Sequence, residues 1–167
     1  MTIAEILLQD FDTEMKGTRT TLERVPEGNP DFKCHEKSMP MGYLAVHVAT
    51  LPKFGITILT TDVLDMAVQK FPSMEFESRE KLLSDFDALS AEARGILAGA
   101  TDEHLKKNWK LAWGERVFAD APRSILYRTM FFNHLIHHRA QLGVYLRLND
   151  VPVPSLYGPT ADDKMGF

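Results

Sequence analysis

The chain has 167 residues, 44% of them hydrophobic, which is enough to bury one substantial core and too little for two, so we expect a single domain over residues 1–167. Nineteen basic and 23 acidic residues give a formal net charge of −4 without a basic stripe, so the sequence predicts no nucleic-acid partner. The chain has no run of eighteen apolar residues, so we expect no membrane partner. Its first residues include acidic ones and it has a single cysteine, so we expect a cytoplasmic, reducing location.

The first predicted element is an amphipathic helix from Thr2 to about Val25. Apolar residues recur there at every third or fourth position, which is the spacing of one helix face. Prolines and a glycine then end the periodic pattern, and residues 27–37 are polar and aperiodic. We expect this segment to be an ordered loop that carries Cys34 and His35.

The second predicted helix runs from Met41 to about Thr60. Ser38, with a proline two residues later, is a helix-start signal. Pro52 removes one backbone hydrogen bond inside the helix and therefore predicts a kink. His47 lies on the inward face of this helix, which it shares with Leu44, Leu51, Phe54 and Ile58.

Residues 60–78 read as a connection with short helical pieces at most, and a third helix is predicted from about Ser78 to Gly99. Residues 108–119 alternate large apolar and polar side chains around a glycine, which predicts a small hairpin or two extended arms. An isolated hairpin is only marginally stable. We therefore expect it to pack on the helices through Trp109, Trp113 and Phe118.

Pro122 opens a fourth predicted helix, which continues to about Asn149 and is followed by a proline-rich tail. The tail must lie on the body of the protein to be ordered. His134 and His138 are four residues apart in this helix, so their side chains are offset by about 6 Å along the axis and about 40° around it. Both imidazoles can therefore converge on one metal ion.

An ordinary interpretation of each histidine remains open, since a single histidine among apolar neighbours is most often hydrogen-bonded inside the core. Three inward histidines from two helices, His47, His134 and His138, are however the ligand set of an open zinc-type site. No glutamate lies between His134 and His138, which excludes the zincin helix motif and its inverted form.

The sequence of residues 133–141, Asn-His-Leu-Ile-His-His-Arg-Ala-Gln, with its continuation over 142–148 and 151–159, resembles the fourth helix and tail of the DinB/YfiT-like proteins. Residues 37–39 and 44–47 resemble the start of that family's second helix. The resemblance covers essentially the whole chain and implies an all-α four-helix bundle with a small hairpin-like insertion before the last helix. It also implies a divalent-metal site formed by His47, His134 and His138. The sequence departs from the common pattern at Cys34 and Ala140, where the family has proline and glycine.

The same resemblance implies a function. Relatives include thiol S-transferases that use low-molecular-weight thiols and a mycothiol-dependent maleylpyruvate isomerase, and the family's bundle is often dimeric. We therefore expect a homodimer with a Zn²⁺ or Ni²⁺ cofactor. The expected activity is that of a metal-dependent thiol transferase or hydrolase acting on a small-molecule substrate. The candidate substrate contacts are Gln141, Tyr145 and Tyr157. No catalytic acid or base is identified.

The alternative is a non-catalytic helical module in which the metal only clamps the second and fourth helices. Such a structural site is closed by a fourth protein ligand. The candidates near the other ligands in sequence are Cys34, His35 and His137.

Overall fold

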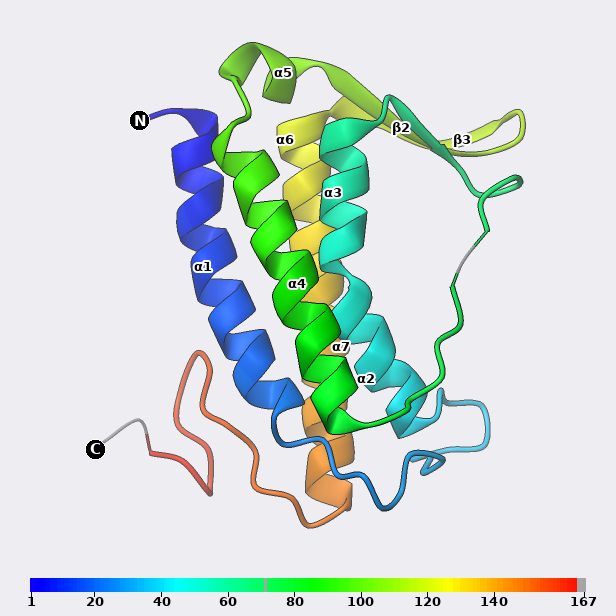
Figure 1. Ribbon diagram of the computed structural model, residues 1–167, viewed down its shortest axis with the longest axis vertical. Helices are drawn as coiled ribbons and strands as arrows, with labels where there is room; N and C mark the ends of the chain where they lie inside the picture. The colour runs from blue at the N-terminus through cyan, green and yellow to red at the C-terminus, as the bar shows by residue number, and fades with distance from the viewer. Residues whose placement is uncertain (71, 165–167) are drawn as a thin grey trace.

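The computed structural model describes residues 1–70 and 72–164 and is mostly helical, with one small three-stranded sheet (Figure 1). Its long helices lie side by side: α1 packs on α4, α4 packs on both α2 and α3, and α2 packs on α7. The bounds of the helices are α1 Ile3–Leu22, α2 Met41–Thr50, α3 Pro52–Thr60, α4 Arg79–Ala98, α5 Asp102–Lys106, α6 Arg123–Leu126 and α7 Asn133–Leu148.

The helices α1 and α4 agree closely with the two predicted from apolar periodicity. A capping box fixes the start of α1, because the Thr2 side chain accepts from the Glu5 backbone and the Glu5 carboxylate accepts from the Thr2 backbone. Ser78 caps α4 by accepting from the Lys81 backbone N–H. The expected first and third helices are therefore confirmed, although α1 ends at Leu22 rather than near Val25.

Pro52 divides the expected second helix into two. In a continuous α-helix the N–H of residue 52 would donate to the carbonyl of Val48, but proline has no N–H. The Val48 carbonyl instead accepts from Leu51 at 3.4 Å, and α3 begins with Pro52 in its first turn. The predicted kink is thus a break between α2 and α3.

Within residues 1–70 and 72–164, one helical stretch, Met41–Thr60, is long and apolar enough to span a membrane, and an 18-residue window of it has a mean hydropathy of 1.3. Within the structure 56% of that window is buried. A buried core helix meets the same criteria, so this stretch is weak evidence for a membrane span.

The structure is mostly helical, as expected, but its three-stranded sheet means that the all-α class is not confirmed. Its strands are β1 Val63–Asp65, β2 Asn108–Trp113 and β3 Arg116–Pro122, in the order β1-β2-β3. The predicted hairpin is the antiparallel β2–β3 pair, and β1 joins β2 in parallel within the segment expected to be a connection. The Asp65 carboxylate accepts from the Gly114 backbone at 2.9 Å, which ties β1 to the hairpin turn.

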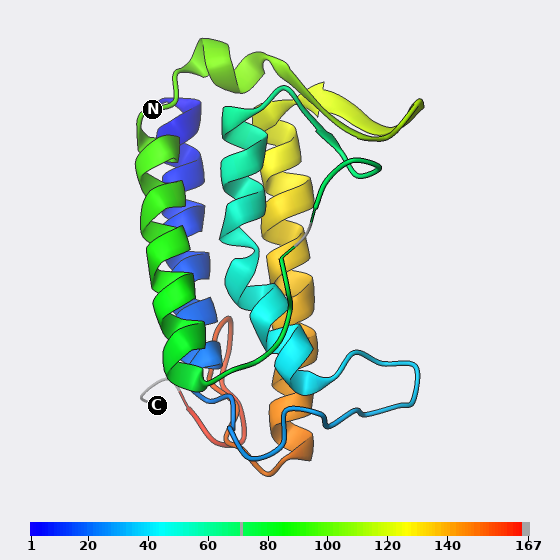
Figure 2. The ribbon, with the colours of Figure 1, turned by 45° about the vertical axis from the view of Figure 1, so that its right-hand side comes forward.

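The hairpin packs on the helices through fewer side chains than expected. Trp109 is fully buried and its indole N–H donates to the Thr61 hydroxyl at 3.0 Å. Trp113 and Phe118 are 59% and 52% exposed. Trp113 pairs with Arg116 beside the hairpin turn, and Phe118 follows two residues later; this end of the hairpin projects from the helices (Figure 2). Trp109 is therefore the aromatic anchor of this sheet.

The fourth predicted helix is continuous in its path but not in its hydrogen bonding. Between α6 and α7 lies η1, Tyr127–Phe132, a π-helical segment with i→i+5 bonds. Its aromatic side chains Tyr127, Phe131 and Phe132 are fully buried and contact Phe11 of α1 and Gly55 of α3. This cluster belongs to the core and lies directly before α7 in the chain.

The tail after α7 lies against α1, as expected of an ordered tail. Arg24 donates to the Pro152 carbonyl at 3.0 Å, and the Tyr157 hydroxyl donates to the Glu14 carboxylate at 2.6 Å. Residues 165–167, the end of the predicted tail, lie outside the described residues.

Candidate metal centre

Three histidine side chains meet between α2 and α7. His47 comes from α2, and His134 and His138 come from successive turns of α7. The ring centroids are 5.1 Å apart for His47 and His134, 4.6 Å for His47 and His138, and 4.7 Å for His134 and His138. One nitrogen from each ring lies within 4.8 Å of the other two, so the three residues could hold a metal ion.

The spacing of one pair of donor atoms, from His47 and His134, fits a tetrahedral ion. Zn–N bonds of about 2.0–2.1 Å at a tetrahedral angle place two ligand nitrogens about 3.3–3.4 Å apart. The Nε2 atoms of His47 and His134 are 3.3 Å apart. The residues present therefore suit a divalent metal, although the arrangement does not distinguish zinc from nickel.

Burial keeps the three imidazoles neutral. Desolvation is the main cause that lowers the pKa of His47 and of His134 to about 4, and the neighbouring histidines lower it further. The pKa of His138 is also lowered by burial. Metal ligands must be deprotonated, and these rings have their lone pairs available at neutral pH.

An aromatic wall stands beside the centre. The ring of Phe54, on α3, meets His134 edge-on with centroids 6.4 Å apart and packs on Trp109 of β2 at 5.9 Å. The sequence placed Phe54 on the same face as His47, but its contact with His134 depends on how α3 and α7 pack. These two rings therefore flank the centre on the side of α3 and β2.

The proposed substrate contacts occupy different places. Gln141 accepts a hydrogen bond from His138, with 2.7 Å between Oε1 and Nδ1. Tyr145 lies one turn further along α7 and donates to the Met39 carbonyl at 2.8 Å. Tyr157 instead contacts Glu14 and Arg139 on the side of α7 that faces α1, away from the expected role.

The three residues considered as a fourth ligand do not belong to the histidine cluster. Cys34 is exposed and bonds to Ser38, and the His35 ring accepts from the Lys37 backbone. His137 is exposed, with its ring centroid 4.8 Å from that of His138. Within residues 1–70 and 72–164, the cluster thus offers three protein ligands.

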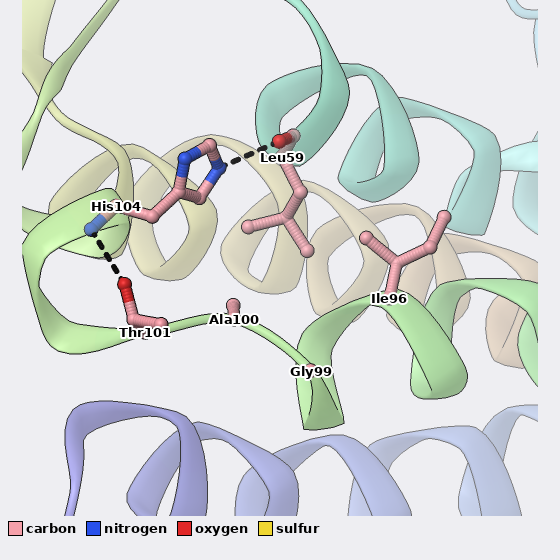
Figure 3. A pocket seen from close by; sticks show the side chains of 6 residues that line it. All are labelled: Leu59, Ile96, Gly99, Ala100, Thr101 and His104. Atoms are coloured by element: carbon pink, nitrogen blue, oxygen red, sulfur yellow. Dashed lines mark hydrogen bonds between the residues drawn. The ribbon is translucent and has the colours of Figure 1, made fainter.

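A pocket of about 230 Å³ lies elsewhere, between the ends of α3, α4 and α5, and contains none of the three histidines. Figure 3 shows His104 at its edge, donating from Nε2 to the Leu59 carbonyl at 2.7 Å. The Thr101 hydroxyl accepts from the His104 backbone at 3.2 Å. The one imidazole of this pocket is therefore held by the end of α3.

The family model described as the DinB family matches residues 2–165. No curated protein matches the chain.

Two solved structures share the fold. A DinB-like protein from Bacillus cereus ATCC 10987 is 20% identical with a TM-score of 0.66, and the match covers 90% of this chain and 95% of that one. A DinB-like protein, YjoA, from Bacillus subtilis is 19% identical with a TM-score of 0.66, covering 94% and 98%. At these identities the likeness concerns the fold.

Proposed function

Because this chain belongs to the DinB family, we propose that it is a metal-dependent enzyme that binds one Zn²⁺ or Ni²⁺ through His47, His134 and His138. We propose that the substrate is a small molecule and that the metal ion activates a thiol or a water molecule. The proposal includes the family's four-helix bundle and a cytoplasmic homodimer.

The observation that carries the proposal is the convergence of three neutral imidazoles, whose nitrogens lie within 4.8 Å of one another, without a fourth protein ligand in the cluster. Catalytic zinc sites have three protein ligands and an open position, whereas structural sites are closed by four. When bound, the ion supplies Lewis acidity that lowers the pKa of a coordinated thiol or water.

The side chains around the centre have separate roles in this proposal. The histidines hold the ion, and Phe54 with Trp109 excludes water from the side of α3. Gln141 and Tyr145 follow His138 along α7 at intervals of three and seven residues, so they lie on the same side of the helix, and Gln141 contacts His138. We assign the orientation of the substrate to these two residues rather than to Tyr157.

Metal content tests the proposal. Protein purified without a histidine tag and loaded with Zn²⁺ or Ni²⁺ should retain about one equivalent after dialysis. His47→Ala should lose the metal, whereas His35→Ala, at an exposed histidine outside the cluster, should retain it. Wild-type protein with less than about a tenth of an equivalent, unrestored by added metal, would contradict the proposal.

The clamp remains the second candidate, because the ligands come from two different helices, α2 and α7. A clamp predicts that chelation strongly lowers the melting temperature and that no thiol binds. The enzyme predicts a metal-free protein that stays folded, since the core has buried aromatic and aliphatic side chains of its own. Circular dichroism with and without chelator separates the two.

The substrate class has its own test. Metal-loaded protein would be screened with bacillithiol, mycothiol, glutathione and cysteine, each with an electrophilic acceptor. A thiol transferase consumes one of these thiols only in the loaded wild-type protein. A rate equal to that of His47→Ala for all four would remove the thiol from the proposal.

A further inference from the structure

His138 differs from the other two histidines in having a side-chain hydrogen bond to a residue outside the cluster. Its Nδ1 lies 2.7 Å from the side-chain oxygen of Gln141, three residues later on α7. Among the residues that the structure describes, His47 and His134 have no comparable contact at Nδ1; their ring contacts are with each other, His138 and Phe54.

The chemistry of this contact fixes the position of a proton. The side-chain oxygen of glutamine carries no hydrogen and can only accept. A contact of 2.7 Å therefore requires Nδ1 of His138 to carry the proton and to donate it to Gln141. In a neutral imidazole the other nitrogen, Nε2, is then unprotonated and has a free lone pair.

The contact between His138 and Gln141 forms within one helix, α7. Residues three apart on an α-helix are neighbours on its surface, so Gln141 reaches His138 without any contribution from another element. Gln141 is itself exposed, and a substitution at an exposed position usually changes stability by less than about 0.5 kcal/mol. Its role can therefore be tested without disturbing the core.

We propose that Gln141 is a positioning residue of the metal centre: its side-chain oxygen holds His138 in the Nδ1–H tautomer and so presents Nε2 to the ion. The expected effect of Gln141 on metal affinity rests on the proposed function, because it requires that the three histidines bind a metal ion. The tautomer itself is a property of the metal-free protein and is measured independently. Partners of this kind contribute about 10–100-fold to metal affinity in characterised sites.

The experiment compares three variants. Gln141→Met keeps the length of the side chain but removes the acceptor, and Gln141→Glu keeps an acceptor at the same position. Gln9→Met makes the first change at an exposed position of α1 outside the centre and is the matched control. Each protein is titrated with Zn²⁺ against a chromogenic chelator, and the histidine tautomers of the metal-free proteins are measured by long-range ¹H–¹⁵N NMR.

We expect Gln141→Met to bind Zn²⁺ about 10–100-fold more weakly than Gln9→Met and to lose the defined Nδ1–H tautomer at His138. Gln141→Glu should keep the tautomer and bind within a few-fold of wild type or more tightly. Two results overturn the inference: equal Zn²⁺ affinity in the two methionine variants, or an unchanged His138 tautomer in Gln141→Met.

Failure of the proposed function is distinguishable from failure of this inference. If wild-type protein binds no metal, the proposed function fails, and the metal-free NMR spectrum still decides whether Gln141 sets the tautomer. If the wild type binds metal but His138 is in the Nε2–H form, only the inference fails.

Discussion

His47 and His134 are buried in their neutral form, which makes the stability of the metal-free protein depend on pH. Burial lowers the pKa of each ring from an ordinary value of 6.5 to about 4. Between these values the unfolded chain binds more protons than the folded protein, so the free energy of unfolding falls as pH decreases. This contribution is complete above about pH 6.5 and is lost progressively toward pH 4.

We therefore expect urea unfolding in the presence of a chelator to give a lower free energy at pH 4.5 than at pH 7. A double variant, His47→Gln with His134→Gln, removes both groups and leaves the carboxylates in place. Its stability should change less over the same range. An identical pH dependence in wild type and variant would show that these histidines are not the cause.

For individual residues, the sequence predicted most of the candidate metal centre. The pair His134 and His138 followed from helical spacing alone, and His47 followed from its inward position on the second predicted helix. The place of Tyr157 could not be predicted, because its partners Glu14 and Arg139 come from two helices whose packing the local pattern does not specify. Gln141 was predicted near the centre, but its bond to His138 depends on the chosen side-chain rotamer.

At the scale of elements, α3 and η1 approach each other closely at Gly55. A Cβ atom added there would lie 2.9 Å from the Phe131 ring and 3.2 Å from the Tyr127 ring, both of which are fully buried. A packed interior does not yield easily to extra atoms. This glycine therefore allows the core cluster to form beside the ligand helix.

Gly55→Ala should lower the free energy of unfolding by about 1–3 kcal/mol, the usual effect of overpacking a core. Gly95→Ala is the matched control, since nothing lies within 4 Å of the added Cβ on α4. It should raise stability by about 0.5–1 kcal/mol, because alanine is the better helix former. Urea unfolding of both variants measures the difference, and a stabilised Gly55→Ala would contradict the close packing.

Elements were predicted well where the signal was long and poorly where it was short. Periodicity over about twenty residues indicated α1 and α4, and Pro52 indicated the break before α3. The strand β1 has three residues, too few for an alternating pattern, and it forms only by pairing with β2. The π-helical bonds of η1 left no mark on the apolar pattern, which predicted one uninterrupted helix.

At the scale of the whole molecule, a buried ion pair joins α1, α7 and the tail. The Arg139 guanidinium lies 2.7 Å from the Glu14 carboxylate, and both side chains are at least 90% buried. Arg139 also donates to the Thr18 hydroxyl and to the Tyr157 hydroxyl. One guanidinium thus connects α1 with α7 and with the tail that follows α7, which lie at opposite ends of the sequence.

Replacing Glu14 by methionine should lower the free energy of unfolding by about 3–5 kcal/mol, because Arg139 would remain buried without its counter-charge. Asp12→Asn tests an exposed pair on the same helix, Asp12 with Arg94, and should change stability by less than about 1 kcal/mol. Chemical unfolding gives both values. Equal effects of the two substitutions would show that burial does not determine the contribution of the Glu14 pair.

The π-helical segment η1 separates two parts of the last helical stretch that have different contacts. Before it, Arg123 donates to carbonyl groups of Thr61 and Asn108 and so secures the sheet; after it come the three α7 residues of the centre, two of them ligands. Because the i→i+5 bonds of η1 wind the chain more loosely than an α-helix does, each residue of the segment turns less about the helix axis. If the same six residues formed ordinary α-helix, His134, His138 and Gln141 would keep their mutual arrangement but would face a different direction relative to the Arg123 guanidinium and the sheet. The winding of this short segment therefore sets the angle between the sheet and the metal ligands.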